Sequence, residues 1–253
     1  MQGKKIHMRT SSPQKEISIV IPTYNEIDNI QLMISNIQHV LESIYATYEI
    51  LVVDDNSPDG TGEIVENISN NNENVKLIQR STRTGLGDAY KLGFQHTIGD
   101  IIFEIDADLS HDPNDIPKFL KSLEKMDVIV GSRYVKGGGN YNRRKLRIII
   151  SRIANILASF FFNLHLSDCT SGYRAYKREV IDTIIPYVNC QKYTFQVEML
   201  EKANHFGFSI GEIPIKFRDR HKGKSKFNFS EIKEFLKELI KRVLLINRIK
   251  KKR

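Results

Sequence analysis

The chain has 253 residues and a formal net charge of +8, with 40% hydrophobic and 27% charged residues. This length is enough for one α/β domain, and the ordinary composition excludes a low-complexity or disordered chain. The two cysteines, Cys169 and Cys190, exclude a disulfide framework, and no Cys/His cluster has zinc-binding spacing. The excess positive charge favours anionic partners such as phosphates or acidic lipid surfaces.

The first half of the sequence alternates strand and helix patterns. β-branched runs predict strands at Ile17–Ile21, Tyr48–Val53, Val75–Gln79, Asp100–Ile105 and Asp127–Gly131. Helical patterns follow at Glu26–Tyr45, Gly60–Ser69, Gly87–His96 and Pro113–Lys125. This alternation is typical of an α/β fold with a mostly parallel central sheet flanked by helices. Because such sheets bind ligands at the carboxyl ends of their strands, we expect the site in the loops that follow them.

The second half has a different character. An apolar helix is predicted over Arg147–Leu166, and its adjacent Phe160, Phe161 and Phe162 cannot all face one side of a helix. The later segments are a strand (Gly172–Tyr176), a helix (Phe195–Asn204), a strand (Ile210–Phe217), a basic loop (Arg218–Lys226) and a basic amphipathic helix (Ser230–Arg253). We expect a tail over residues 1–15, one domain over 16–229 and a C-terminal helix over 230–253. No apolar stretch reaches the roughly 20 residues of a membrane span, and residues 1–12 lack a signal-peptide core.

The most informative segment is Phe103–Asp108, an apolar run that ends in two carboxylates. Side chains alternate along a strand, so Asp106 and Asp108 can point the same way. Two hard oxygen donors suit Mg²⁺ or Mn²⁺ and a diphosphate that such an ion bridges, with Ser110 as a further candidate ligand. The structural alternative is an Asp-rich turn that only ends a strand. Polar residues in the neighbouring loops would favour a metal site over this alternative.

Two further strand ends are polar. After the first strand, Thr23 and Glu26 have the spacing of a helix-capping box, whereas Tyr24 can face a nucleotide base or ribose. The second strand ends in Asp54 and Asp55, which can bind ribose hydroxyls or base nitrogens. Neither a Walker A motif nor a glycine-rich dinucleotide fingerprint is present. We therefore expect metal and arginine, rather than a glycine loop, to hold phosphate.

A family resemblance rests on segments in order from Ile17 to Phe229. These include Ile-Val-Ile-Pro-Thr-Tyr-Asn-Glu, Val-Val-Asp-Asp-Asn-Ser-Pro-Asp-Gly-Thr, Arg-Thr-Gly-Leu-Gly-Asp-Ala-Tyr, Asp-Ala-Asp-Leu-Ser-His-Asp-Pro, Gly-Ser-Arg-Tyr and Asp-Cys-Thr-Ser-Gly-Tyr-Arg. They resemble inverting family-2 glycosyltransferases of the GT-A (nucleotide-diphospho-sugar transferase) type, and among these the dolichyl-phosphate mannosyltransferases. The resemblance implies a GT-A fold with C-terminal amphipathic interface helices. It also implies mannose transfer from GDP-mannose to dolichyl phosphate with inversion, which supplies GPI-anchor, N-glycan and O-/C-mannosylation pathways.

The resemblance also implies residue roles. The nucleotide sugar would bind Pro22, Tyr24, Glu26, Val53, Asp54, Asp55, Asp106, Ala107, Asp108, Arg133, Arg220 and Lys226. The metal would bind Asp106, Asp108 and Ser110, although some relatives have glutamine at the serine position. Arg147 and Ser151, one helical turn apart, would hold the acceptor phosphate, and the catalytic group would be Asp108, Arg133, Arg147 and Ser151. Gln196 and Glu198 either belong to the site or brace their helix.

The partners implied by the resemblance are GDP-mannose, dolichyl phosphate and Mg²⁺ or Mn²⁺, with Ca²⁺ as an alternative. The expected location is the cytosolic face of the endoplasmic reticulum membrane, held peripherally, with small membrane-spanning regulatory subunits as further partners. No nucleic-acid partner is expected, because no nucleic-acid-binding motif is present. The alternatives are a dolichyl-phosphate glucosyltransferase that uses UDP-glucose and a non-catalytic nucleotide-sugar or membrane-surface binding protein.

Overall fold

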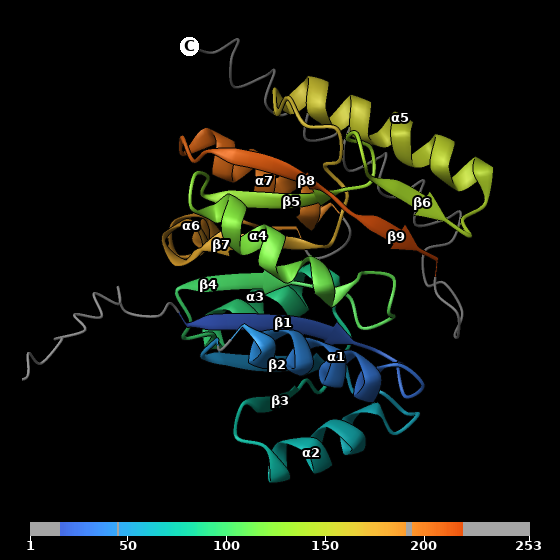
Figure 1. The fold of residues 1–253 in the computed structure, drawn as a ribbon, viewed down its shortest axis with the longest axis vertical. Coiled ribbons are helices and arrows are strands. Elements are labelled where there is room, and N and C mark those ends of the chain that lie inside the picture. The colour runs from blue at the N-terminus through green and yellow to red at the C-terminus, as the bar shows by residue number, and fades with distance from the viewer. Residues whose placement is uncertain (1–15, 45, 191–193, 220–253) are drawn as a thin grey trace, which may run out of the picture.

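A seven-stranded sheet lies between two layers of helices (Figure 1). The computed structural model describes residues 16–44, 46–190 and 194–219. The strands of this sheet are β1 (Ile17–Thr23), β2 (Tyr48–Asp54), β3 (Val75–Gln79), β4 (Ile101–Glu104), β5 (Val128–Ser132), β7 (Arg174–Lys177) and β8 (Ile210–Pro214). A second, two-stranded sheet pairs β6 (Gly139–Tyr141) with β9 (Lys216–Arg218).

The helices are α1 (Ile30–Ser43), α2 (Thr61–Asn71), α3 (Leu86–His96), α4 (Ile116–Leu123), α5 (Lys145–Phe162), α6 (Arg178–Ile184) and α7 (Phe195–His205). Short 3-10 turns cover η1 (Pro113–Asp115) and η2 (Ile185–Tyr187). The large sheet has the strand order β3-β2-β1-β4-β7-β5-β8. Its pairs are parallel except where β7 lies antiparallel between β4 and β5. The predicted mostly parallel sheet flanked by helices is confirmed.

Each face of the sheet buries its own apolar cluster. On β1, Ile19 and Ile21 pack with α1, α2 and α4, whereas Val20 packs on the other face with α3, α5, α6 and α7. This is the period-2 alternation that the strand sequence predicts. The two helical layers leave the carboxyl ends of β1, β2 and β4 open along one edge, which is where the site is expected.

Several predicted boundaries were wrong. Thr23 is the last residue of β1 and its hydroxyl donates to Asp54, so the capping box does not form. The first helix begins at Ile30, because the segment before it is tied across to the start of α2, where the Glu26 N–H donates to the Thr61 hydroxyl. The predicted strand Ile210–Phe217 is divided between β8 and β9, which belong to different sheets.

The helix expected over Arg147–Leu166 is α5, which begins at Lys145 and ends at Phe162. Asn163 stops it with a left-handed backbone at φ 51°. The prediction that adjacent phenylalanines face different ways is confirmed, since Phe162 is buried and Phe160 is 79% exposed. The tail and the C-terminal helix lie outside the described residues. Among those described, no helix is long and apolar enough to cross a bilayer.

Candidate functional site

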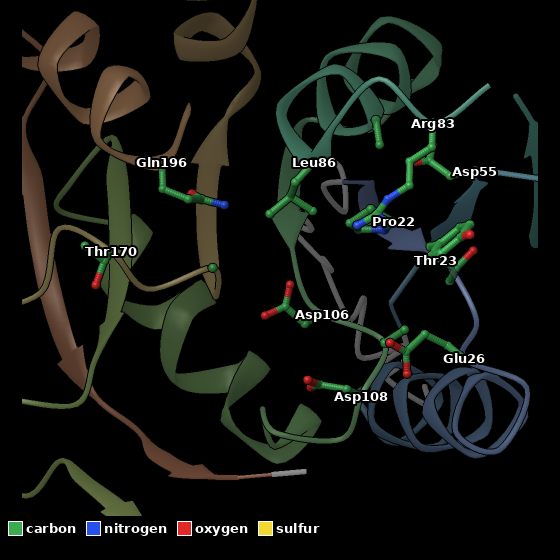
Figure 2. A pocket seen from close by; sticks show the side chains of 14 residues that line it. Pro22, Thr23, Glu26, Asp55, Arg83, Leu86, Asp106, Asp108, Thr170 and Gln196 are labelled. Atoms are coloured by element: carbon green, nitrogen blue, oxygen red, sulfur yellow. The ribbon is translucent and has the colours of Figure 1, made fainter. Parts of the chain in front are cut away.

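A pocket opens at the carboxyl ends of β1, β2 and β4 (Figure 2). Residues from six segments of the chain line it, namely Pro22, Thr23, Tyr24, Glu26, Asp55, Arg83, Leu86, Ala89, Asp106, Ala107, Asp108, Thr170, Gly172 and Gln196. Loops far apart in sequence therefore converge on one edge of the sheet. This is the crevice where open α/β sheets bind ligands.

The two aspartates after β4 lie in the middle of this pocket (Figure 2). The backbone of Leu109, directly after them, has φ 61°, which is rare for a bulky residue. The Ser110 N–H donates to Asp108 Oδ1 at 3.0 Å and closes the turn. Strained backbone of this kind is found where the surrounding structure must hold side chains in a required position. The loop therefore fixes Asp108 beside Asp106.

The donor set fits a divalent cation of the Mg²⁺ type. Asp106 and Asp108 supply hard oxygens, and the Asp106 side chain is 35% exposed to the pocket. The Ser110 hydroxyl behind them is buried and makes no hydrogen bond within the described residues. The described part of the chain holds no cluster of three or more His, Cys, Asp or Glu suited to a metal. Two carboxylates are the usual protein share of a Mg²⁺ site that keeps water and substrate phosphate as its other ligands.

One end of the pocket combines an aromatic ring, a cation and a carboxylate. The Arg83 guanidinium lies 4.4 Å from the centre of the Tyr24 ring. Asp55 forms an ion pair with Arg80 at 2.8 Å, with both side chains nearly buried. Burial raises the pKa of Asp55, and the positive charges of Arg80 and Arg83 oppose that rise. A flat, partly charged surface of this kind suits a nucleoside, because bases stack on rings and guanidinium groups.

Of the two aspartates after β2, Asp55 faces the pocket and Asp54 does not. Asp54 is fully buried and accepts hydrogen bonds from the Thr23 hydroxyl and from the backbone N–H and hydroxyl of Ser57. Neighbouring residues on a strand point to opposite sides, so only one of the pair can reach the ligand side. Asp54 therefore has a structural role in the protein, and its predicted contact with a nucleotide stays a prediction. Val53 packs in the core, so only its backbone can reach a nucleotide.

The opposite end of the pocket is formed by Thr170, Gly172 and Gln196 (Figure 2). The buried Arg174 holds these segments together, donating to the backbone oxygens of Cys169, Ser171 and Gln196 at 2.9, 2.8 and 2.6 Å. A β-carbon at Gly172 would lie 3.3 Å from Asp106 Oδ2. The glycine thus lets this loop approach the aspartate closely without covering its carboxylate.

Arg133, predicted to meet the donor phosphates, is held inside the protein. Its Nε and Nη2 donate to the two oxygens of Asp168, each at 2.7 Å, and Nη2 also donates to Thr170 at 2.8 Å. Although burial acts against ionisation, Arg133 holds the pKa of Asp168 below its usual range. Arg133 does not line the pocket, but it anchors Thr170, which does. A phosphate contact by Arg133 stays a prediction.

The remaining predicted residues lie elsewhere. Arg147 and Ser151 are half-buried on α5 and do not line this pocket. Ser110 is buried and does not line this pocket. Glu198 braces the chain before α7, where its carboxylate accepts N–H groups of Asn189 and Cys190 at 3.1 and 2.6 Å. Arg220 and Lys226 lie outside the described residues.

Sequence reasoning placed eight of the lining residues in or near the site, namely Pro22, Tyr24, Glu26, Asp55, Asp106, Ala107, Asp108 and Gln196. It missed Arg83, Leu86, Thr170 and Gly172 among others. Their signals were present: Arg83 begins the segment Arg-Thr-Gly-Leu-Gly-Asp-Ala-Tyr after β3, which supports the family resemblance but was given no residue role. Thr170 and Gly172 lie within the segment Asp-Cys-Thr-Ser-Gly-Tyr-Arg that supports the family resemblance.

A family model described as "Glycosyl transferase family 2" matches residues 18–185. Polyprenol monophosphomannose synthase of Mycolicibacterium smegmatis is 36% identical over 239 residues, covering 92% of this chain and 89% of that protein. Undecaprenyl-phosphate mannosyltransferase of Micrococcus luteus is 35% identical over 213 residues, covering 83% of this chain and 86% of that protein.

Among solved structures, glucosyl-3-phosphoglycerate synthase of Mycobacterium tuberculosis with Mn²⁺, uridine diphosphate and phosphoglyceric acid aligns with a TM-score of 0.70 at 21% identity. The alignment covers 90% of this chain and 78% of that one. Mannosyl-3-phosphoglycerate synthase of Rubrobacter xylanophilus aligns with a TM-score of 0.61 at 17% identity, over 94% and 75% of the two chains. These structural likenesses concern the fold alone.

Proposed function

Because the chain belongs to glycosyltransferase family 2, we propose that it transfers mannose from GDP-mannose to a polyprenyl phosphate. Its GT-A-like α/β fold is the fold predicted from the sequence. The mannosyl and polyprenyl parts of the proposal are supported by two relatives named for these groups, each above a third identical. Within this proposal, guanosine as the nucleoside and dolichyl phosphate as the acceptor follow from the sequence resemblance.

The observation that carries the proposal is the arrangement of the pocket. Asp106 and Asp108 lie between the end that holds Tyr24, Asp55 and Arg83 and the end that holds Gln196. A nucleotide sugar has the same order of parts, with the nucleoside and the sugar on either side of a diphosphate. A divalent cation held by Asp106 and Asp108 would supply Lewis-acid stabilisation of the leaving diphosphate.

The reaction joins two anions, so the chain has to hold each in place. The acceptor phosphate is ionised near neutral pH and can attack the anomeric carbon without a general base. The site differs in this respect from a glycoside hydrolase, which needs two working carboxylates. Attack from the side opposite the leaving diphosphate inverts the configuration, from an α-linked donor to a β-linked product. Arg147 and Ser151 on α5, with Arg220 and Lys226, are the proposed groups for the two sets of phosphate oxygens, while Arg133 holds Thr170 at the pocket wall.

The surface of α5 supports a peripheral position on a membrane. Its side chains at spacings of three and four residues form one exposed apolar stripe, Leu146, Ile149, Ile153, Ile156 and Phe160, each at least 51% exposed. Basic residues gather at its start, at Arg143, Arg144, Lys145 and Arg147. Apolar side chains beside cations are typical of helices that lie in the interface of an anionic bilayer. The cytosolic face of the endoplasmic reticulum, with small membrane-spanning subunits, is the location that the resemblance implies.

The test is a transfer assay with the purified full-length chain. Radiolabelled GDP-mannose, a Mg²⁺ or Mn²⁺ salt and dolichyl phosphate are incubated, and label is followed into the organic phase. We expect metal-dependent, chloroform-extractable mannosyl lipid that mild acid hydrolyses. A parallel reaction with undecaprenyl phosphate distinguishes a dolichol-specific enzyme from a general polyprenyl-phosphate enzyme.

A third reaction replaces the donor with UDP-glucose. Turnover of UDP-glucose without turnover of GDP-mannose would contradict the proposed donor. Binding of nucleotide sugar with no lipid product from either donor and either acceptor would contradict an enzymatic role and favour a binding protein.

A further inference from the structure

Gln196 is the most unusual polar residue in the pocket wall. It is 4% exposed, lines the pocket and points its amide toward the middle of it (Figure 2). Neither the oxygen nor the nitrogen of this amide makes a hydrogen bond within the described residues. A buried polar group left unpaired costs about 1–3 kcal/mol, so such groups are rare and need an explanation. An amide held in this state beside a cavity indicates that a ligand completes its hydrogen bonds.

Two other buried residues also have unpaired polar atoms. The Tyr90 hydroxyl and Glu104 Oε2 are also buried without hydrogen-bond partners in the described part of the chain. Burial raises the pKa of Glu104, while Arg174 and the nearby Gln196 amide lower it. Burial together with the charges of Asp106 and Glu104 raises the pKa of the Tyr90 hydroxyl well above its usual range. Tyr90 and Glu104 are fully buried and do not line the pocket, but the Tyr90 ring stacks on Phe195, the neighbour of Gln196 in the chain.

The main chain fixes the position of Gln196 independently of its side chain. Arg174 donates to the Gln196 backbone oxygen at 2.6 Å and to the Tyr176 hydroxyl at 3.4 Å. The Tyr176 hydroxyl in turn donates to Glu104 at 2.8 Å. A substitution at residue 196 keeps the backbone contact, because the backbone oxygen remains. The amide is therefore not needed to hold α7 in place.

The chemistry of the amide selects among the parts of a nucleotide sugar. An amide offers donors and an acceptor without charge, which matches hydroxyl groups that both donate and accept. Phosphate oxygens are better matched by cations. Gln196 also lies on the opposite side of Asp106 from Asp55 and Arg83, away from the proposed nucleoside end (Figure 2).

We propose that the Gln196 amide binds hydroxyl groups of the donor's hexosyl ring and is the residue that recognises the sugar. The inference rests on the proposed function, since it assumes a nucleotide-sugar donor with its diphosphate at Asp106 and Asp108. Gln196 thus distinguishes the loaded donor from the free nucleoside diphosphate.

The test compares two ligands on three variants of the full chain. Calorimetry measures the affinities for GDP-mannose and for GDP, each with Mn²⁺ and without acceptor, in Gln196→Ala, Gln196→Met and the control Gln31→Ala. The control removes an exposed glutamine on α1. We expect the Gln196 variants to bind GDP-mannose about tenfold more weakly, about 1.4 kcal/mol, with GDP affinity changed less than twofold. The control should bind both ligands as the unaltered chain does.

Gln196→Met keeps the length and volume of the side chain, so it decides the question if Gln196→Ala does not fold. Equal losses for GDP and GDP-mannose, or no loss for either, would overturn the inference. If the unaltered chain turns over GDP-mannose while Gln196→Met binds it normally, only this inference fails. If the unaltered chain binds GDP but not GDP-mannose, the proposed function fails with it.

Discussion

The two halves of the described chain use charged side chains in different ways. In the first half, from β1 to α4, the carboxylates of Asp55, Asp106 and Asp108 line the pocket at strand ends. In the second half, from β5 to β9, the most buried cations are enclosed by the protein itself. Arg133 is paired with Asp168, and Arg174 is fully buried among backbone oxygens. One half presents charge to a ligand, and the other uses charge to fix the loops that complete the pocket.

This difference predicts two kinds of mutational effect. Removing a pocket carboxylate of the first half should remove activity and leave folding largely intact. Removing a cation of the second half should lower stability first, because an unpaired buried charge remains.

The largest effect is expected for Asp108→Asn. Loss of one of the two carboxylates that would hold the cation should cost several kcal/mol of transition-state stabilisation, on the order of a thousandfold in kcat. The measurement is the transfer assay beside a thermal melt. Asp182→Asn, an exposed aspartate on α6 with a side chain 63% exposed, is the matched control and should keep full turnover. Turnover by Asp108→Asn within a few-fold of normal would contradict the role of the first-half carboxylates in holding the cation.

Arg133→Ala is expected to lower the free energy of unfolding by about 3–5 kcal/mol, since Asp168 is then left buried without its partner. Denaturation in urea measures this loss. The double variant Arg133→Met with Asp168→Leu should recover most of it. Asp182→Ala, which breaks the exposed contact with Arg178 at 3.8 Å, should cost less than about 1 kcal/mol. If Arg133→Ala keeps its stability and loses only turnover, Arg133 acts on the ligand as the first-half carboxylates do. That result would contradict the proposed difference between the two halves.

The exposed apolar stripe on α5 belongs to the second half. Substitutions in it are expected to have an intermediate effect, on membrane binding. Ile153→Glu with Phe160→Glu should weaken binding to anionic lipid vesicles at least about tenfold, because each fully buried apolar side chain contributes roughly 1.5–3 kcal/mol. Co-sedimentation with vesicles measures the binding. Ile98→Glu, at a single apolar residue that is 63% exposed and lies outside α5, is the control. Equal vesicle binding by the stripe variant and the control would contradict a membrane position for α5.

The smallest effect concerns Asp127, which joins the second-half strands. Hydrogen bonds from Lys177 and Ser209 lower the pKa of Asp127 to about 2. A lowered pKa stabilises the folded chain above the ordinary aspartate pKa, and this stabilisation is lost as pH falls toward 2. Asp127→Asn should therefore cost about 1 kcal/mol at pH 7 and nearly nothing at pH 2. Urea denaturation at both pH values measures it, and a cost that does not depend on pH would contradict the ion-pair explanation.

The sequence predicted best what depends on short-range pattern. Asp106 and Asp108 were identified because they directly follow an apolar run, although β4 ends at Glu104 and the turn after it, rather than strand alternation, sets their direction. Between Asp54 and Asp55, strand alternation says only that one faces the ligand. The parallel register of β1 on β2 determines which one, because it sets Thr23 beside Asp54. The Thr23 hydroxyl then donates to the Asp54 carboxylate, and Asp55 is the residue that faces the pocket.

Long-range partners were beyond the sequence pattern. Arg133 follows a strand end and was expected to meet phosphate, but its partner Asp168 lies 35 residues further on. Likewise, Arg83 reaches the pocket because it stacks on Tyr24, which belongs to another loop. Local patterns give the type and direction of a side chain, whereas folding decides which charge it meets.

The most direct test of the account is a crystal structure of the full chain with Mn²⁺ and GDP-mannose. Anomalous scattering locates the manganese independently of the protein model. The account predicts one peak bonded to Asp106 and Asp108, with guanine at the Tyr24 and Arg83 end and mannose beside Gln196. A manganese peak away from both aspartates, or a nucleotide bound in the reverse direction, would contradict it.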